Sequence, residues 1–298
     1  MPAPLRGTQT LVGQMGWVFA RPSLTAIEVA WRWTFGLPFI IVVLLEAIKV
    51  LIALPPKSAG LSAIDLQNPW VAVTQLNSAW ALYRPHCAAV LHWLLPAAAL
   101  AWIIVSALGR SLLLKRMEPT LRLRPLSMIA LQAAWLAGFG LISWAWLRSM
   151  QWVAATHITP NAEPDLVGFA VWAIFLSLGF FTAWALTSWA LSIAPLLMLL
   201  EGRTALSAFG QTLRLGKPMT ARLVEINMVM GIVNMALLVL TMVLSAAPLP
   251  FSDQLGPEAL HVVWSAAVLF YFVASDYFQV VRQKGFYEFW LIDRGPQA

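Results

Sequence analysis

The stretch LVGFAVWAIFLSLGFFTAWALTSWALSIAPLLMLL, residues 166–200, decides the class of fold because it contains no charged side chain. About 20 apolar residues are enough for a helix to cross the ~30 Å hydrocarbon core of a bilayer. As a straight helix this stretch would measure ~52 Å at ~1.5 Å per residue. We therefore expect it to cross once and then to bend near Pro195 along the inner membrane surface.

The composition extends this conclusion to the whole chain of 298 residues. Charged residues make up 11% of it and hydrophobic residues 60%, with a mean hydropathy of +0.75. Soluble globular proteins carry roughly 25% charged residues, which they need to cover a surface that faces water. This composition excludes a disordered chain and most soluble folds, and it makes the lipid bilayer the first expected partner.

Further apolar segments on both sides of residues 166–200 are also long enough to span a membrane. In lipid the backbone must satisfy its own hydrogen bonds, and the residue-by-residue alternation of a barrel strand is absent, so we expect helices. The prediction is an all-α polytopic membrane helix bundle that forms a single integral membrane domain over residues 1–298. The six expected spans are residues 33–54, 87–108, 126–147, 166–190, 223–247 and 261–281.

Lysine and arginine residues lie on the two sides of these spans in very unequal numbers. Of the 19, one side holds fifteen, the other holds three, and Lys49 lies within the first span. The three are Lys57, Arg84 and Arg148. Because the side rich in Lys and Arg faces the cytoplasm, we expect the N-terminal segment, residues 1–32, and the tail, residues 282–298, to be cytoplasmic. This topology explains the excess of positive charge, so no nucleic-acid partner is predicted.

Three shorter stretches have apolar residues at the spacing of a helix that lies on the membrane surface. The first begins at Ser23 as an N-cap and leads into the first span, the second covers residues 69–83, and the third covers residues 206–213. In the third stretch, Leu206 and Leu213 oppose a polar face. A solvated helix packed on the bundle fits these patterns equally well.

Charged and polar side chains inside the spans are costly in lipid, so each raises a question about function. Glu46 and Lys49 are three residues apart in the first span, a spacing that favours a structural ion pair. The last two spans carry a second group, which we expect to meet as one polar cluster facing the cytoplasm. Its members are Glu225, Asn227, Asn234 and Asp276. The cluster suits either an ion or proton path or a clamp between the two spans, and we favour the clamp.

Histidine offers a candidate cofactor ligand. His92 lies within the second span, where an imidazole suits the metal of a haem or chlorophyll-type tetrapyrrole as well as a hydrogen bond to a neighbouring helix. The lone cysteine, Cys87, excludes an intrachain disulfide. None of the motifs HExxH, CxxC, GxSxG or GxxxxGKS/T occurs. We therefore predict no metal site, no catalytic residue and no enzyme activity, and no cofactor is strongly implied.

The stretch EGRTALSAFGQTLRLGK, residues 201–217, leads directly into the fifth span. It resembles an element of a loose group of bacterial multi-pass proteins, among them the membrane domain attached to some glycerophosphodiester phosphodiesterases. In that group a span ends, an acidic residue and a short amphipathic helix follow, and the next span begins. The match is carried by Glu201, Ala205, Leu206, Leu213 and Gly216. The resemblance implies an architecture and a place in the bacterial cytoplasmic (inner) membrane, but no phosphodiesterase activity.

These observations leave three functions open. We expect first a non-catalytic integral membrane protein, a scaffold or accessory subunit of a membrane complex, with other membrane protein subunits as partners. The alternatives are a small transporter or channel that uses the Glu225 and Asp276 cluster, and a tetrapyrrole-binding membrane subunit that uses His92. The absence of catalytic motifs and the 16 tryptophans available for contacts with lipid or protein favour the first function.

Overall fold

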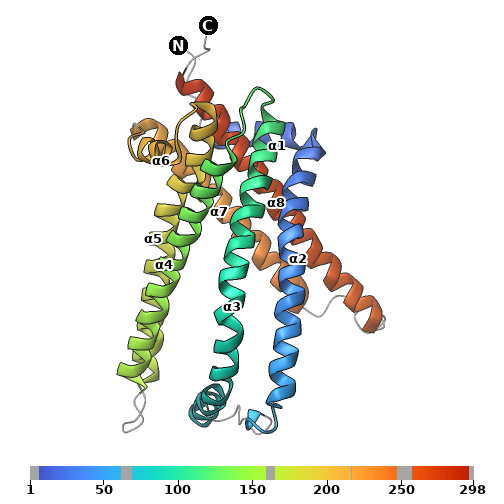
Figure 1. The fold of residues 1–298 in the computed structure, drawn as a ribbon, viewed down its shortest axis with the longest axis vertical. Coiled ribbons are helices and arrows are strands. Elements are labelled where there is room, and N and C mark those ends of the chain that lie inside the picture. The colour runs from blue at the N-terminus through green and yellow to red at the C-terminus, as the bar shows by residue number, and fades with distance from the viewer. Residues whose placement is uncertain (1–6, 62–68, 159–164, 216, 247–256, 295–298) are drawn as a thin grey trace. The chain divides into compact units, whose positions relative to one another are not determined.

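The computed structural model describes residues 7–61, 69–158, 165–215, 217–246 and 257–294, and these residues are almost entirely helical. Those ranges contain no strand, which confirms the all-α prediction. Figure 1 shows the helices coloured in chain order. They are α1 (Gly7–Phe19), α2 (Pro22–Ala53), α3 (Pro69–Met117), α4 (Pro125–His157), α5 (Leu166–Leu200), α6 (Ala205–Leu213), α7 (Lys217–Ala246) and α8 (Pro257–Arg294).

Six of these helices, α2, α3, α4, α5, α7 and α8, are long and apolar enough to cross a membrane. This confirms the prediction of six spans, and the chain is a multi-pass helical membrane protein. Helix α8 is longer than its expected span, because it continues as one helix to Arg294 through the predicted tail. An ion pair of 2.5 Å between Lys284 and Glu288, one helical turn apart, supports this extension.

The chain divides into two compact units. Residues 30–106 hold most of α2 and α3, and we call them the hairpin unit. Residues 1–29 together with 107–298 form the main unit. The main unit therefore holds α1, the start of α2, the end of α3, and all of α4 to α8.

The two helices of the hairpin unit contact each other near both of their ends. The ring centroid of Trp102 lies 5.7 Å from that of Trp31 and 5.1 Å from that of Phe35. Near the opposite end, the Tyr83 hydroxyl donates a 2.9 Å hydrogen bond to the Leu54 carbonyl oxygen. Such specific contacts matter in lipid, because lipid tails provide no hydrophobic drive to bring two helices together.

The surface helices expected before the first and second spans are not separate elements. The segment from Ser23 is part of α2, and residues 69–83 begin α3, which continues through Pro85 and Pro96. A proline inside a helix removes one backbone hydrogen bond and bends the helix without having to end it. In Figure 1 the first turns of α3 run across the direction of its remainder, so the chain changes course without a break between two helices.

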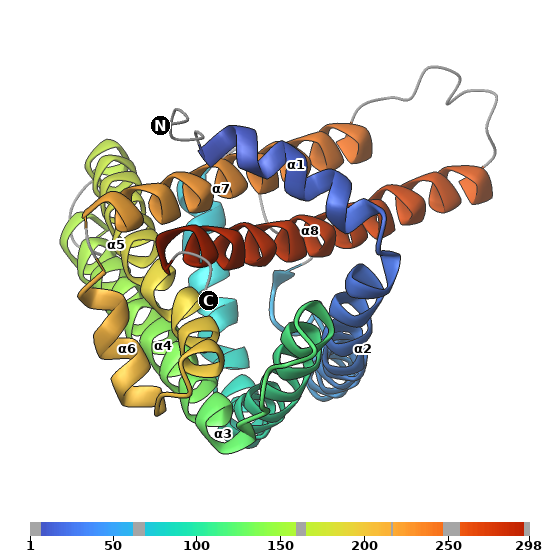
Figure 2. The same ribbon diagram turned by 90° about the horizontal axis from the view of Figure 1, so that it is seen from above.

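Packing in the main unit brings α4 against α5 and α7 against α8, and α1 contacts both α7 and α8 (Figure 2). Its core gathers at what we call the basic end, namely the C-terminal ends of α3, α5 and α8 and the N-terminal ends of α4 and α7. Among its fully buried side chains are Leu113, Met128, Leu197, Ile226 and Phe289. Away from this end the spans pack loosely against one another. In the most apolar stretches of α5 and α8, no residue is buried.

Helix α6 has features of both arrangements expected for residues 206–213, a helix on the membrane surface and a helix packed on the bundle. Its small residues Ala208 and Thr212 are fully buried where the helix packs against α5. Leu206 is 82% exposed and Leu213 is 62% exposed. The helix therefore packs on the bundle and also turns its leucines outward, which is the arrangement of an interfacial helix.

A side-chain clasp joins the end of α4 to the start of α5. The Asp165 carboxylate accepts a 2.8 Å hydrogen bond from the Gly168 backbone N–H and lies 3.1 Å from His157 Nδ1. Asp165 thus caps the first turn of α5. The Gly168 N–H, followed by His157, holds the pKa of Asp165 below its usual value. A Cβ atom at residue 168 would collide with the Asp165 carboxylate, so any side chain at this position has to displace that carboxylate.

Replacing Gly168 with alanine should therefore lower the melting temperature of the purified protein, because the new Cβ expels Asp165 from its capping position. Gly179, on the same helix, is a matched control, since a Cβ there meets no atom within 4 Å. Gly179→Ala should leave the melting temperature unchanged or raise it, because alanine reduces the freedom of the unfolded chain. Size-exclusion chromatography after heating measures both variants, and an equal loss in the two would contradict the clasp.

Candidate functional site

A side-chain hydrogen bond joins α7 to α8 at the predicted polar cluster. Arg282 donates a 3.0 Å hydrogen bond from a terminal guanidinium nitrogen to Asn227 Oδ1. Consecutive spans run antiparallel, so Asp276, about two turns before Arg282, lies near the level of Asn234, about two turns after Asn227. Asp276 is 4% exposed, Glu225 is half-buried, and the buried Asn234 Oδ1 has no hydrogen-bond partner among the described residues. The bond from Arg282 joins the two helices as a clamp does, while an ion path along them stays a prediction.

Sequence reasoning missed a second group of buried polar residues in the main unit. Glu28 is fully buried and Lys284 is 6% exposed. Lys284 Nζ lies 4.4 Å from the centre of the Trp17 ring, and the Arg21 guanidinium lies 4.0 Å from the same centre. Trp17 therefore attracts two cations, and its contact with Lys284 holds α1 on α8. The only sequence signal was the spacing of Lys284 and Glu288, one helical turn apart.

A pocket of about 610 Å³ opens at the basic end of the main unit. It lies between the connection from α3 to α4, the corner between α5 and α6, and α8, and we call it the corner pocket. Three leucines form its apolar part, and charged, hydroxyl and aromatic side chains form the rest. The polar lining comes from Glu118, Thr120, Arg122, Arg124, Glu201, Tyr287 and Trp290.

Glu201 connects the corner between α5 and α6 to α8. It is the C-cap of α5, and Gly202 follows with φ +64°, a left-handed conformation that lets the chain turn sharply after a helix. The Glu201 carboxylate accepts a 2.5 Å hydrogen bond from Arg203 Nε and a 3.3 Å hydrogen bond from Trp290 Nε1. Its side chain is 7% exposed, so this anion is both buried and paired. Glu201, the acidic residue at the start of the stretch 201–217, therefore lies in the wall of the corner pocket.

Glu118 makes a similar connection between the end of α3 and α8. Its carboxylate accepts 2.7 Å hydrogen bonds from the hydroxyl groups of Thr120 and Tyr287. These bonds, with Thr120 contributing most, hold the pKa of Glu118 below its usual value. Glu118 therefore stays ionised at neutral pH, and it stays hydrogen-bonded to two donors of the protein itself.

This lowered pKa predicts an acid-dependent loss of stability. Because the folded state lowers the pKa of Glu118, its stabilising effect is present above the ordinary glutamate pKa and is lost as the pH falls through the lowered value. Glu118→Gln should cost about 1 kcal/mol or less at neutral pH, since the site is partly solvated. In melting curves recorded from neutral to acidic pH, wild type and variant should converge at the acidic limit. A difference between them that did not change with pH would contradict this role for the carboxylate.

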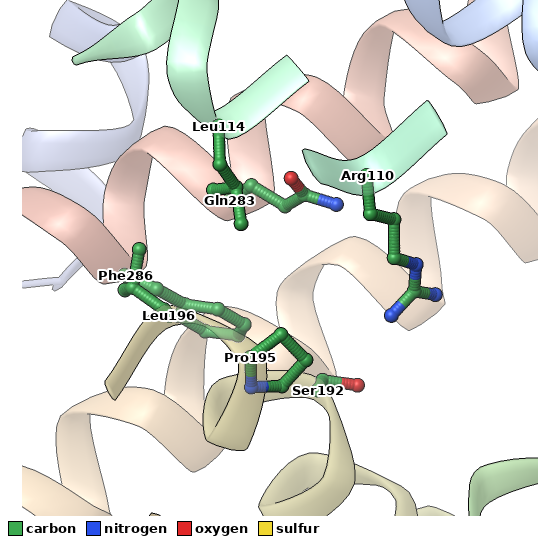
Figure 3. Close-up of a pocket in the computed structure, with 7 residues that line it drawn as sticks. All are labelled: Arg110, Leu114, Ser192, Pro195, Leu196, Gln283 and Phe286. Atoms are coloured by element: carbon green, nitrogen blue, oxygen red, sulfur yellow. The ribbon is translucent and has the colours of Figure 1, made fainter. Parts of the chain in front are cut away.

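A much smaller gap lies among α3, α5 and α8 at the same end (Figure 3). Pro195 has no N–H, so α5 lacks one backbone hydrogen bond here. The side chains of Arg110 and Gln283 extend into the gap, and the buried Gln283 Oε1 has no hydrogen-bond partner among the described residues. The volume of about 10 Å³ matches a single water molecule, so a substrate has no room in it.

The remaining predicted site residues lie in the hairpin unit. Lys49 Nζ is 2.5 Å from Glu46 Oε1, with the Lys49 side chain 69% exposed and the Glu46 side chain 16% exposed. His92 lies on an exposed face of α3. No group of three or more His, Cys, Asp or Glu residues that could hold a metal ion occurs in the described part of the chain. The tetrapyrrole hypothesis therefore depends on His92 alone and stays a prediction.

Comparisons of the chain with protein-family models, curated proteins and solved structures found no match. The resemblance over residues 201–217 therefore stays a prediction. The structure places Ala205 at the start of α6, with Leu206 and Leu213 exposed on that helix, while Gly216 lies outside the described residues. The fold defines a class, a multi-pass helical membrane protein whose packed core and corner pocket lie at one end of the main unit.

Proposed function

We propose that the chain is a non-catalytic scaffold or accessory subunit of a membrane complex in the bacterial cytoplasmic membrane. The observation that carries this proposal is an apolar groove of about 530 Å³ within the main unit, lined by residues of α5 and α7. The lining residues are Ala173, Ile174, Ser177, Leu178, Phe181 and Met235. Four of them are largely exposed, with Ile174 at 69%, Leu178 at 63%, Phe181 at 60% and Met235 at 52%.

The shape of this groove suits a transmembrane helix of a partner subunit. Ala173 and Ser177 are one helical turn apart, and small residues at this spacing let the backbone of a neighbouring helix approach closely. The Ser177 hydroxyl already accepts a 3.0 Å hydrogen bond from Trp146 Nε1, so the groove offers mainly apolar surface. In lipid, helices associate through close packing of this kind, because the hydrophobic effect does not drive them together.

A photo-reactive amino acid placed at Leu178 tests the proposal in native membranes. It should form a discrete adduct with one membrane protein, which mass spectrometry identifies. Leu141 on α4 is the matched control, because its exposure of 66% is close to that of Leu178. Ala173→Trp should fill the groove and abolish the Leu178 adduct. Adducts with lipid alone, or the same protein adduct at both positions, would contradict a partner helix in this groove.

We also infer that both termini face the cytoplasm. The support is the fifteen Lys and Arg residues on one side of the spans against three on the other. A reporter that is active only in the cytoplasm, fused after Ala298, should be active. A cysteine introduced at Arg122 in a Cys87→Ser background should resist an impermeant thiol reagent added from the periplasmic side. Rapid labelling there, or an inactive but expressed fusion, would overturn this topology.

A further inference from the structure

Two arginines of the corner pocket keep donors available, whereas its two carboxylates are engaged. Glu118 and Glu201 each accept hydrogen bonds from two side chains of the protein, as described above. Arg124 donates one hydrogen bond of 3.3 Å, to the Arg203 carbonyl oxygen. Arg122 makes no hydrogen bond or ion pair with any residue that the structure describes, and both arginines are exposed at the pocket. The pocket therefore offers positively charged N–H donors that are not used by the protein, and these suit an anionic ligand.

The chemistry of these donors favours a phosphate group. A guanidinium presents a planar fork of N–H donors that matches two oxygens of a phosphate, which a lysine ammonium does not. Arg122 and Arg124 are two positions apart on one short connection, so both side chains line the same pocket. Gly202 keeps the space beside them open, because a Cβ atom at that position would lie 3.3 Å from a terminal nitrogen of Arg124.

The apolar part of the pocket favours a phosphate carried by a lipid. Leu121, Leu199 and Leu200 line the pocket together with the arginines, and free phosphate would gain nothing from these side chains. Tyr287 and Trp290 line it as well, and such amphipathic rings are typical of the headgroup level of a membrane. The pocket also lies where α5 ends and turns into α6, whose exposed leucines suit the membrane surface.

We propose that the corner pocket binds the headgroup of an anionic phospholipid. Arg122 and Arg124 contact the phosphate oxygens, and the leucines contact the first carbons of the acyl chains. Glu118 and Glu201 keep the pocket in shape through their own hydrogen bonds. The proposal is independent of the partner groove between α5 and α7, because the two sites share no residue.

Lipid binding to the full-length chain in a neutral detergent tests the proposal. The probes are a short-chain phosphatidylglycerol, a phosphatidylcholine with the same chains, and inorganic phosphate, with binding followed by native mass spectrometry. Phosphatidylglycerol should bind most tightly. The pair Arg122→Gln and Arg124→Gln should weaken its binding at least tenfold, a factor that corresponds to about 1.4 kcal/mol. The pair Arg116→Gln and Arg214→Gln removes the same charge from exposed positions outside the pocket and should leave binding unchanged.

Several outcomes would overturn the proposal. Equal weakening by the two glutamine pairs would mean that overall charge, and not the pocket, attracts the lipid. If phosphatidylcholine bound as tightly as phosphatidylglycerol, the pocket would have no preference for an anionic headgroup. If inorganic phosphate bound as tightly, the acyl chains would contribute nothing and the ligand would not be a lipid. The pair Arg122→Lys and Arg124→Lys keeps the charge and the fold but loses the planar fork. The lysine pair should bind phosphatidylglycerol more weakly than wild type does and more tightly than the glutamine pair does. Wild-type affinity in both double variants would show that Arg122 and Arg124 do not bind the lipid.

Discussion

Replacing Phe289 with alanine should lower the free energy of unfolding in detergent by about 3–5 kcal/mol. Phe289 is 1% exposed and belongs to the core at the basic end of the main unit. The Arg222 guanidinium lies 5.6 Å from the centre of its ring, so truncation removes this contact as well as the packing. The neighbouring helices cannot collapse fully into the space left by a missing ring, and the remaining cavity adds to the loss.

Ile292 on the same helix provides the control for this prediction. Its side chain is 52% exposed, so Ile292→Ala removes little packing and should change the free energy of unfolding by less than about 1 kcal/mol. Unfolding of both variants in mixed micelles, followed by far-ultraviolet circular dichroism, gives the comparison. Similar losses in the two variants would mean that the core does not lie at the basic end.

The second large effect is expected at Glu201. Glu201→Gln should lower the free energy of unfolding by about 1.5–3 kcal/mol, the range for a hydrogen bond to a charged group. Glutamine keeps the shape of the side chain and can still accept the hydrogen bond from Trp290, but it cannot pair with the Arg203 cation. The loss should therefore come mainly from the contact that turns the chain from α5 into α6.

A double-mutant cycle separates that contact from other effects of the substitution. Glu201→Gln and Arg203→Gln should each destabilise the protein, and the double variant should be less destabilised than the sum of the two. The same unfolding measurement supplies all four values of the cycle. Strict additivity would show that the pair contributes nothing, and the loss at Glu201 would then have to come from its other contacts, such as a weaker hydrogen bond from Trp290.

The membrane architecture could be predicted from local composition, because a span in lipid is a property of about 20 consecutive residues. The run from Leu166 to Leu200 and the five other apolar segments all became helices of sufficient length. The boundaries of two surface helices were wrong for a physical reason. The segment from Ser23 and residues 69–83 were expected to be separate surface helices, but each is continuous with the span that follows it. A helix in lipid keeps its hydrogen bonds wherever it can and continues through a proline such as Pro85 with a bend.

The polar contacts could be predicted only in part. Asn227 and Asp276 stood out because a polar residue is rare inside a span, and the structure joins their two helices through Arg282. The corner pocket could not be predicted, because its walls come from three distant parts of the chain. Glu118, Glu201 and Trp290 each resemble ordinary residues at the end of a helix until packing brings them together.

What the sequence by itself determined is that this chain crosses a membrane six times as helices, because lipid demands long apolar segments that satisfy their own hydrogen bonds. Only the tertiary structure decided where those helices touch. The core gathers at the basic end, the spans stay open along the rest of their length, and two carboxylates are engaged beside two arginines that keep free donors. These features depend on packing between residues far apart in the chain. The order of residues along one segment does not show which distant residues it will contact.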